Sequence, residues 1–99
     1  METDSQIIQK INSFFKDKPV KKVYLFGSFA RGEAQAGSDI DLYLELDYQK
    51  NTGLAFYGWF EQLKELLNLE VDIVTTNSAS PYIKPFIEKD KRLVYERLS

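Results

Sequence analysis

The chain has 99 residues, 43% of them hydrophobic and 28% charged, which suits a single domain over residues 1–99 and leaves no room for two. Thirteen Lys and Arg residues against 15 Asp and Glu residues give a formal net charge of −2, which argues against a basic face that binds nucleic acid. The sequence contains neither cysteine nor histidine, which excludes disulfides, thiolate metal sites and imidazole-based catalysis and leaves carboxylates as candidate catalytic groups. No apolar stretch is long enough to span a membrane, and the N-terminus lacks the basic start of a signal peptide, so we expect a cytoplasmic protein.

The first half of the chain predicts a helix followed by two strands. Apolar residues recur at spacings of three and four from Ser5 to Lys16, which is typical of an amphipathic helix. Val20 to Phe26 ends in a continuous apolar run, which predicts a strand covered on both faces. Residues 28–31 fit a single helical turn. Strict alternation of apolar and polar residues from Asp39 to Asp47 predicts the second strand.

The second half predicts a long helix, a short strand and a C-terminal part with two alternatives. A helical stripe runs from Leu54 to Asn68, and Glu70 to Thr75 alternates as a strand. Pro81 is expected to open a last helix that reaches about Lys89. Arg92 to Glu96 is either an edge strand or a continuation of that helix to Leu98. This order of elements predicts an α/β fold in which helices pack on a small mixed sheet.

Two aspartates on the predicted 39–47 strand form the first half of a candidate site. Asp39 and Asp41 are two residues apart, so their side chains leave the same face and can reach one cation. Asp72 has the same phase on the 70–75 strand and joins them if the two strands are neighbours. Clustered carboxylates repel one another unless a cation lies between them, and oxygen ligands favour Mg²⁺ or Mn²⁺. We therefore expect one or two such ions here, with Asp72 also able to accept a proton from an attacking hydroxyl.

Gly27 and Ser28 form the second half of the candidate site. Glycine lets the backbone approach an anion closely, and a serine hydroxyl and free amides at a helix start donate hydrogen bonds to phosphate. Arg31, one turn further on, either offers more donors to the same anion or pairs with Glu33 or another surface acid. Glu33 also stands where a Walker A loop carries its lysine, which excludes that motif.

The segment GSFARGEAQAGSDIDLYLEL, residues 27–46, resembles the signature of the minimal nucleotidyltransferases of the polymerase-beta superfamily, in which G-S-x-A-R-G is followed by S-D-I-D-L. The order of elements is similar over nearly the whole chain. The resemblance implies nucleotide-phosphate contacts for Gly27 and Ser28 and metal-binding roles for Asp39, Asp41 and Asp72.

The same resemblance implies an activity and a partner. Family members transfer a nucleoside monophosphate, commonly from ATP, to a hydroxyl with Mg²⁺, and release pyrophosphate. The smallest members are frequently paired with a HEPN-type toxin, which they neutralise by adenylylating a tyrosine on it. The resemblance thus implies an antitoxin whose partner is encoded by an adjacent gene. The alternative is a catalytically silent antitoxin that covers its partner sterically; transfer to a small molecule is disfavoured because the chain has no second domain to enclose one.

Aromatic residues give a further, weaker hypothesis. The four aromatic residues of the 54–68 helix cannot all fit one buried stripe, so one or two are expected to face outward and form a partner or homo-oligomer surface. The residues concerned are Phe56, Tyr57, Trp59 and Phe60, and with less force Tyr82, Phe86 and Tyr95.

Overall fold

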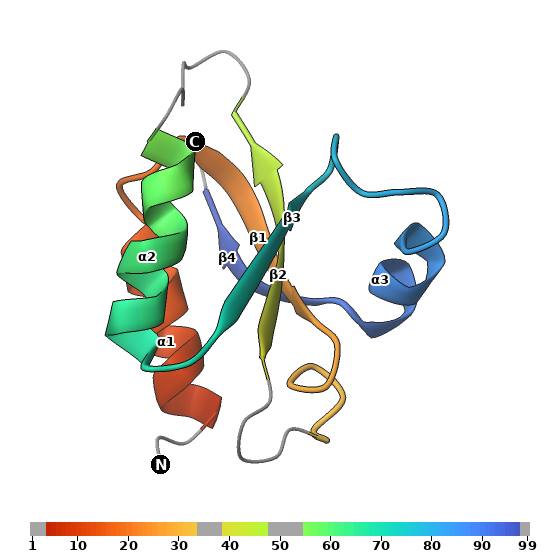
Figure 1. Ribbon diagram of the computed structural model, residues 1–99, viewed down its shortest axis with the longest axis horizontal. Helices are drawn as coiled ribbons and strands as arrows, with labels where there is room; N and C mark the ends of the chain where they lie inside the picture. The colour runs from red at the N-terminus through yellow and green to blue at the C-terminus, as the bar shows by residue number, and fades with distance from the viewer. Residues whose placement is uncertain (1–3, 34–38, 48–54, 98–99) are drawn as a thin grey trace.

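The computed structural model describes residues 4–33, 39–47 and 55–97, which form a four-stranded sheet with helices on both faces (Figure 1). In chain order the elements are α1 (Asp4–Phe15), β1 (Val20–Phe26), β2 (Ile40–Leu46), α2 (Ala55–Leu67), β3 (Val71–Thr75), α3 (Lys84–Asp90) and β4 (Arg92–Glu96). The strand order is β3-β2-β1-β4, and only the β2–β3 pair is parallel, which confirms the predicted small mixed sheet. None of the helices described here is both long enough and apolar enough to cross a membrane.

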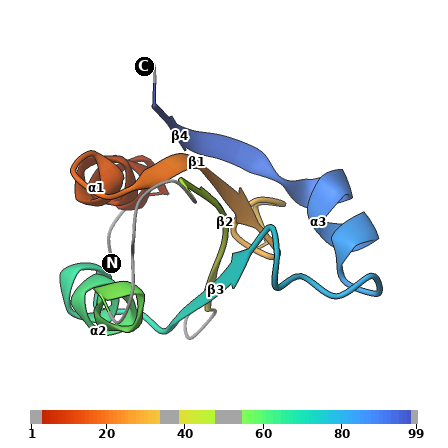
Figure 2. The ribbon, with the colours of Figure 1, turned by 90° about the horizontal axis from the view of Figure 1, so that it is seen from above.

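The alternation along β2 divides the molecule into two apolar layers. Ile40, Leu42 and Leu44 are fully buried and pack, with residues of α1 and α2, in the main core on one face of the sheet. Tyr43 points to the other face, where it forms a smaller cluster with Phe26 and with Ile87 of α3. Figure 2 shows α1 and α2 on one side of the sheet and α3 beyond its other side. Polar residues of β2 therefore face the side that α3 covers only in part.

The last helix begins later than the sequence analysis expected. Residues 81–83 form turns, and α3 starts at Lys84 because Pro85 occupies one of the first two helical positions. A proline lacks the N–H that the helix interior needs and is tolerated only in the first turn. A helix that started at Pro81 would place Pro85 in its interior. The predicted start at Pro81 is therefore wrong, and Pro85 was the signal that identifies the correct one.

The C-terminal segment is an edge strand and not a helical extension to Leu98. β4 pairs antiparallel with β1, and Val94 and Tyr95 are buried. Just beyond it, Arg97 Nη2 donates to Asp47 Oδ2 at 2.8 Å. Asp47 is only 5% exposed, although it belongs to the polar phase of its strand. The ion pair thus holds the residue that follows β4 against the end of β2.

We expect Arg97→Ala to destabilise the fold by about 2 kcal/mol, because it removes a charged hydrogen-bond partner from a buried carboxylate. Lys22→Ala is the matched control, since Lys22 Nζ lies 3.7 Å from Glu96 Oε2 in a half-exposed pair. That change should cost less than about 1 kcal/mol. Urea denaturation of the three proteins measures both values, and equal midpoints for wild type and Arg97→Ala would contradict the assigned role.

Candidate functional site

The parallel pairing of β2 with β3 sets two of the predicted site residues side by side. Asp41 and Asp72 are direct partners in the register, so both side chains leave the face of the sheet opposite the main core. Asp39 lies one residue before β2, in phase with Asp41. The condition placed on Asp72, that its strand neighbours the 39–47 strand, is therefore met.

Burial and repulsion between these carboxylates act strongly on Asp41. The pKa of Asp41 is raised from its ordinary 3.8 to about 6, first because the half-buried carboxylate loses solvent and then because the charges of Asp72 and Asp39 are near. The positive charge of Arg31 opposes this and lowers the pKa. We call Asp39, Asp41 and Asp72 the carboxylate patch, since their charges act on one another.

The carboxylate patch does not form a closed set of ligands in the present side-chain positions. Within the part of the chain that the structure describes, no three acidic side chains come close enough together to hold a metal ion. The expected meeting of all three carboxylates at one point is thus not seen, although the backbone pairing brings two of them together. Asp39 and Asp72 are exposed and have room to turn. Carboxylates that repel one another are suitable ligands for a hard divalent cation. Because they do not form a closed set here, the ligand roles of Asp39, Asp41 and Asp72 stay predictions.

Gly27 packs directly against the carboxylate patch. In the antiparallel register Phe26 is opposite Asp41, so the next residue, Gly27, lies beside that carboxylate. Gly27 has a φ of +75°, and a β-carbon built on it would collide with the Asp41 carboxylate oxygen. The backbone conformation therefore favours glycine here, and any larger residue would push the Asp41 carboxylate aside. The predicted phosphate-binding turn and the predicted metal ligands are in contact.

The segment after Gly27 forms a single hydrogen-bonded turn, which the sequence analysis expected over residues 28–31. Arg31 N donates to Gly27 O at 3.1 Å, and Glu33 N donates to Ser28 O at 2.9 Å. Gly32, with a φ of +73°, is the last residue of the turn. A single turn has little dipole, so a helix dipole contributes little to phosphate binding here. Two arguments for phosphate binding remain: the backbone at Gly27 can approach an anion closely, and the Ser28 hydroxyl is half-buried. The phosphate-binding role of Gly27 and Ser28 stays a prediction.

Arg31 is paired with two acids, as the alternative interpretation of this residue allowed. Its Nη1 donates to Asp90 Oδ2 at 2.6 Å, and its Nε donates to Glu33 Oε2 at 3.1 Å. Its predicted contact with nucleotide is not tested by these pairs. Sequence reasoning missed Asp90, because 59 residues separate it from Arg31 and no local spacing connects the two.

The aromatic residues of α2 for which the structure describes side chains pack inward. Trp59 is 3% exposed and Phe60 packs against the main core. Phe56 and Tyr57 have side chains outside the described set. A partner or homo-oligomer surface on α2 therefore stays a prediction.

The aromatic residues near the C-terminus differ from one another. Tyr95 is 7% exposed and lies in the main core, so its suggested place on a partner surface is wrong. Tyr82 and Phe86 are 87% and 67% exposed. Both lie in the segment that leads into and forms α3, on the side of the sheet that carries the carboxylate patch. They remain candidates for a contact with a partner.

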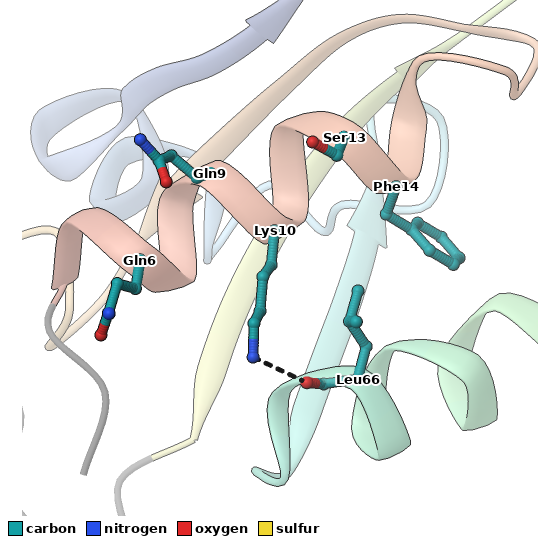
Figure 3. Close-up of a pocket in the computed structure, with 6 residues that line it drawn as sticks. All are labelled: Gln6, Gln9, Lys10, Ser13, Phe14 and Leu66. Atoms are coloured by element: carbon teal, nitrogen blue, oxygen red, sulfur yellow. Dashed lines mark hydrogen bonds between the residues drawn. The ribbon is translucent and has the colours of Figure 1, made fainter.

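An open pocket of about 570 Å³ lies elsewhere, between α1 and α2 (Figure 3). Its lining residues are Gln6, Gln9, Lys10, Ser13, Phe14 and Leu66. Lys10 Nζ donates to Leu66 O at 3.5 Å across it. Since α1 and α2 cover the face of the sheet opposite the carboxylate patch, this pocket is not the candidate site.

Comparison with known proteins identifies the class of enzyme that this fold and site represent. Residues 9–99 match the model of the family described as Polymerase beta, Nucleotidyltransferase. A Methanocaldococcus jannaschii protein with the name "Putative protein adenylyltransferase" is 41% identical over 93 residues, which cover 91% of each chain. The protein is a nucleotidyltransferase, and the chain belongs to the polymerase beta nucleotidyltransferase family.

Solved structures share the fold at lower sequence identity. A crystal structure of a toxin–antitoxin with AMP-PNP has a TM-score of 0.77 and 24% identity, over 92% of this chain and 74% of that one. The complex of a tri-AMPylated Shewanella oneidensis HEPN toxin with an MNT antitoxin has a TM-score of 0.73 and 21% identity, over 96% of this chain and 74% of that one. These likenesses support the nucleotidyltransferase fold predicted from residues 27–46.

Proposed function

We propose that this protein transfers AMP from ATP to a hydroxyl of a partner HEPN-type toxin and so acts as its antitoxin in the cytoplasm. Support comes from the relative named as a protein adenylyltransferase and from the toxin–antitoxin structures that share the fold, one of which holds an AMPylated toxin. In this chain, the proposal is carried by the pairing of Asp41 with Asp72 directly beside Gly27. We further propose that the acceptor hydroxyl belongs to a tyrosine.

The proposed chemistry assigns one task to each part of the site. Asp39, Asp41 and Asp72 would hold Mg²⁺ or Mn²⁺, which when bound supplies positive charge to the phosphate oxygens. Gly27 and Ser28 hold the nucleotide phosphates through backbone amides and the serine hydroxyl. A bond forms between the acceptor oxygen and the α-phosphorus while the bond from that phosphorus to pyrophosphate breaks. The hydroxyl proton passes to the exposed carboxylate of Asp72.

Replacing one ligand of the carboxylate patch tests the proposed activity. We expect Asp39→Asn to lower the transfer of label from α-labelled ATP to the co-encoded HEPN-type protein by about 100-fold, since it removes a charge from the predicted metal site. Glu45→Gln is the matched control, because Glu45 lies on the same strand in the same phase, further from Gly27. It should change labelling less than twofold. Mass spectrometry of the labelled protein then identifies the acceptor, and unchanged labelling with Asp39→Asn would remove the assignment.

The same variant separates catalysis from steric neutralisation. A protein that acts only by covering its partner should inhibit the toxin equally well without ATP and with Asp39→Asn. An enzyme needs both the nucleotide and the aspartate. Toxin activity measured after incubation with wild type or variant, with and without ATP, distinguishes the two.

Removal of divalent cations should have an effect as large as that of a ligand substitution. We expect chelation with EDTA to lower transfer by about 100-fold, and excess Mg²⁺ or Mn²⁺ to restore it. Circular dichroism of the chelated protein should remain that of the folded protein, because the core does not involve the carboxylate patch. Full activity after chelation would contradict the metal requirement.

A further inference from the structure

An ion pair connects the turn after β1 with the end of α3, next to the carboxylate patch. The bond from Arg31 Nη1 to Asp90 Oδ2 is 2.6 Å long, and the second bond of this guanidinium, to Glu33, is 3.1 Å long. The side chain of Asp90 is 13% exposed and that of Glu33 is 64% exposed. Arg31 therefore has one anchor that is partly buried and one anchor in solvent.

The two acids leave part of the Arg31 guanidinium available. The group carries five N–H donors, and neither acid engages its Nη2. The Arg31 side chain is still 43% exposed. Its charge also reaches the carboxylate patch, as the effect on the Asp41 pKa indicates. Arg31 thus keeps unengaged donors and is close enough to the carboxylate patch for its charge to act on Asp41.

The needs of α3 itself do not account for Asp90. An acid at the last residue of a helix lies beside carbonyl groups of partial negative charge, where it is disfavoured. The helix is already held to the sheet by the fully buried Ile87 and is closed by a bond from Lys91 N to Ile87 O at 2.8 Å. A partly exposed ion pair adds little stability. The arrangement is better suited to holding a long, flexible side chain in one direction before a ligand arrives.

We propose that Asp90 is a positioning residue of the nucleotidyl-transfer site, which holds Arg31 so that its unengaged donors bind the triphosphate of the nucleotide. This inference rests on the proposed function. It assigns to α3 a task in nucleotide binding through a residue that does not itself touch the nucleotide. Glu33, exposed and on the other side of the guanidinium, has no such task.

Calorimetric titration of the full chain with ATP and Mg²⁺ tests this inference. We expect Asp90→Ala to weaken ATP binding about tenfold, since Arg31 must then be ordered by the nucleotide itself. Asp90→Asn, which keeps an acceptor oxygen without the charge, should weaken it about threefold. Glu33→Ala removes the other partner of the same guanidinium and should change ATP affinity less than twofold. In an Arg31→Ala background, Asp90→Ala should have no further effect.

Stability and affinity are measured on the same samples, so that a structural role is recognised. Urea denaturation of each variant shows whether it is folded. Lower stability with unchanged ATP affinity in Asp90→Ala and Asp90→Asn would overturn the inference, as would tighter ATP binding in either. Failure of the wild-type protein to bind ATP would overturn the proposed function together with this inference, and so differs from failure of the inference alone.

Discussion

Asp41→Asn is expected to abolish nucleotidyl transfer and, at the same time, to stabilise the protein in the absence of metal. Loss of the half-buried carboxylate at the centre of the carboxylate patch should lower transfer by about 1,000-fold, or about 4 kcal/mol in the activation free energy. The same carboxylate is desolvated and repelled by Asp39 and Asp72, so its charge works against folding. The Asp41 carboxylate is therefore needed for transfer but destabilises the folded protein when no metal is bound.

The stability gain should depend on pH with a definite sign. Because the pKa of Asp41 is about 6 in the folded protein and near 3.8 when unfolded, folding favours the protonated acid. The penalty for the charged form is absent below pH 4, grows as pH rises from 4 to 6, and is complete above about 6. The Asp41→Asn substitution removes this penalty at every pH. We expect Asp41→Asn to be about 1–2 kcal/mol more stable than wild type at pH 8, allowing for the solvent that still reaches the group, and equal to it at pH 4.

Urea denaturation in EDTA at a series of pH values measures this difference. Glu45→Gln again serves as the control, since it removes a carboxylate from the same strand and phase without touching the carboxylate patch. A wild-type protein that is more stable than Asp41→Asn at pH 8 without metal would show that the carboxylate patch is not under repulsion. Added Mg²⁺ should reverse the order by stabilising the wild type only.

Much of the fold was predictable because its signals are local. The alternation from Asp39 to Asp47 has the period of two that a half-buried strand requires, and β2 spans Ile40–Leu46. The same phase argument placed Asp72 correctly, since one face of each strand is buried and a shift of one residue would turn every side chain to the wrong side. The pairing of the two strands was an assumption that only the structure could test.

Contacts between distant residues could not be predicted in this way. Arg31 with Asp90, and Arg97 with Asp47, are 59 and 50 residues apart, and their partners are chosen by the packing of α3 and β4 against the sheet. A charged residue looks the same in sequence whether it is solvated or paired. For this reason the sequence does not reveal the burial of Asp47, and it leaves two interpretations of Arg31 open.

Gly27→Ala is the second substitution with a large expected effect, because its methyl group collides with the Asp41 carboxylate. The positive φ of Gly27 costs any other residue about 1–2 kcal/mol, and turning the Asp41 carboxylate out of the way of the new methyl group adds about 1 kcal/mol. We expect a loss of stability of about 2–3 kcal/mol and a loss of transfer of at least about 100-fold, since the Asp41 carboxylate is displaced from its place beside Asp72. Denaturation and labelling with ATP measure the two effects.

Substitutions at two other glycines separate the cost of the positive φ from the cost of the collision with the Asp41 carboxylate. Gly32 also has a positive φ but a β-carbon there meets no atom within 4 Å, so Gly32→Ala should show the conformational cost alone, about 1 kcal/mol. Gly58 lies inside α2 with similar free space, and Gly58→Ala should stabilise the helix by about 0.5–1 kcal/mol. In an Asp41→Ala background, Gly27→Ala should cost no more than Gly32→Ala, because the colliding carboxylate is gone. If Gly27→Ala lowers the free energy of unfolding equally with and without that carboxylate, contact with the carboxylate patch is not the reason why residue 27 is a glycine.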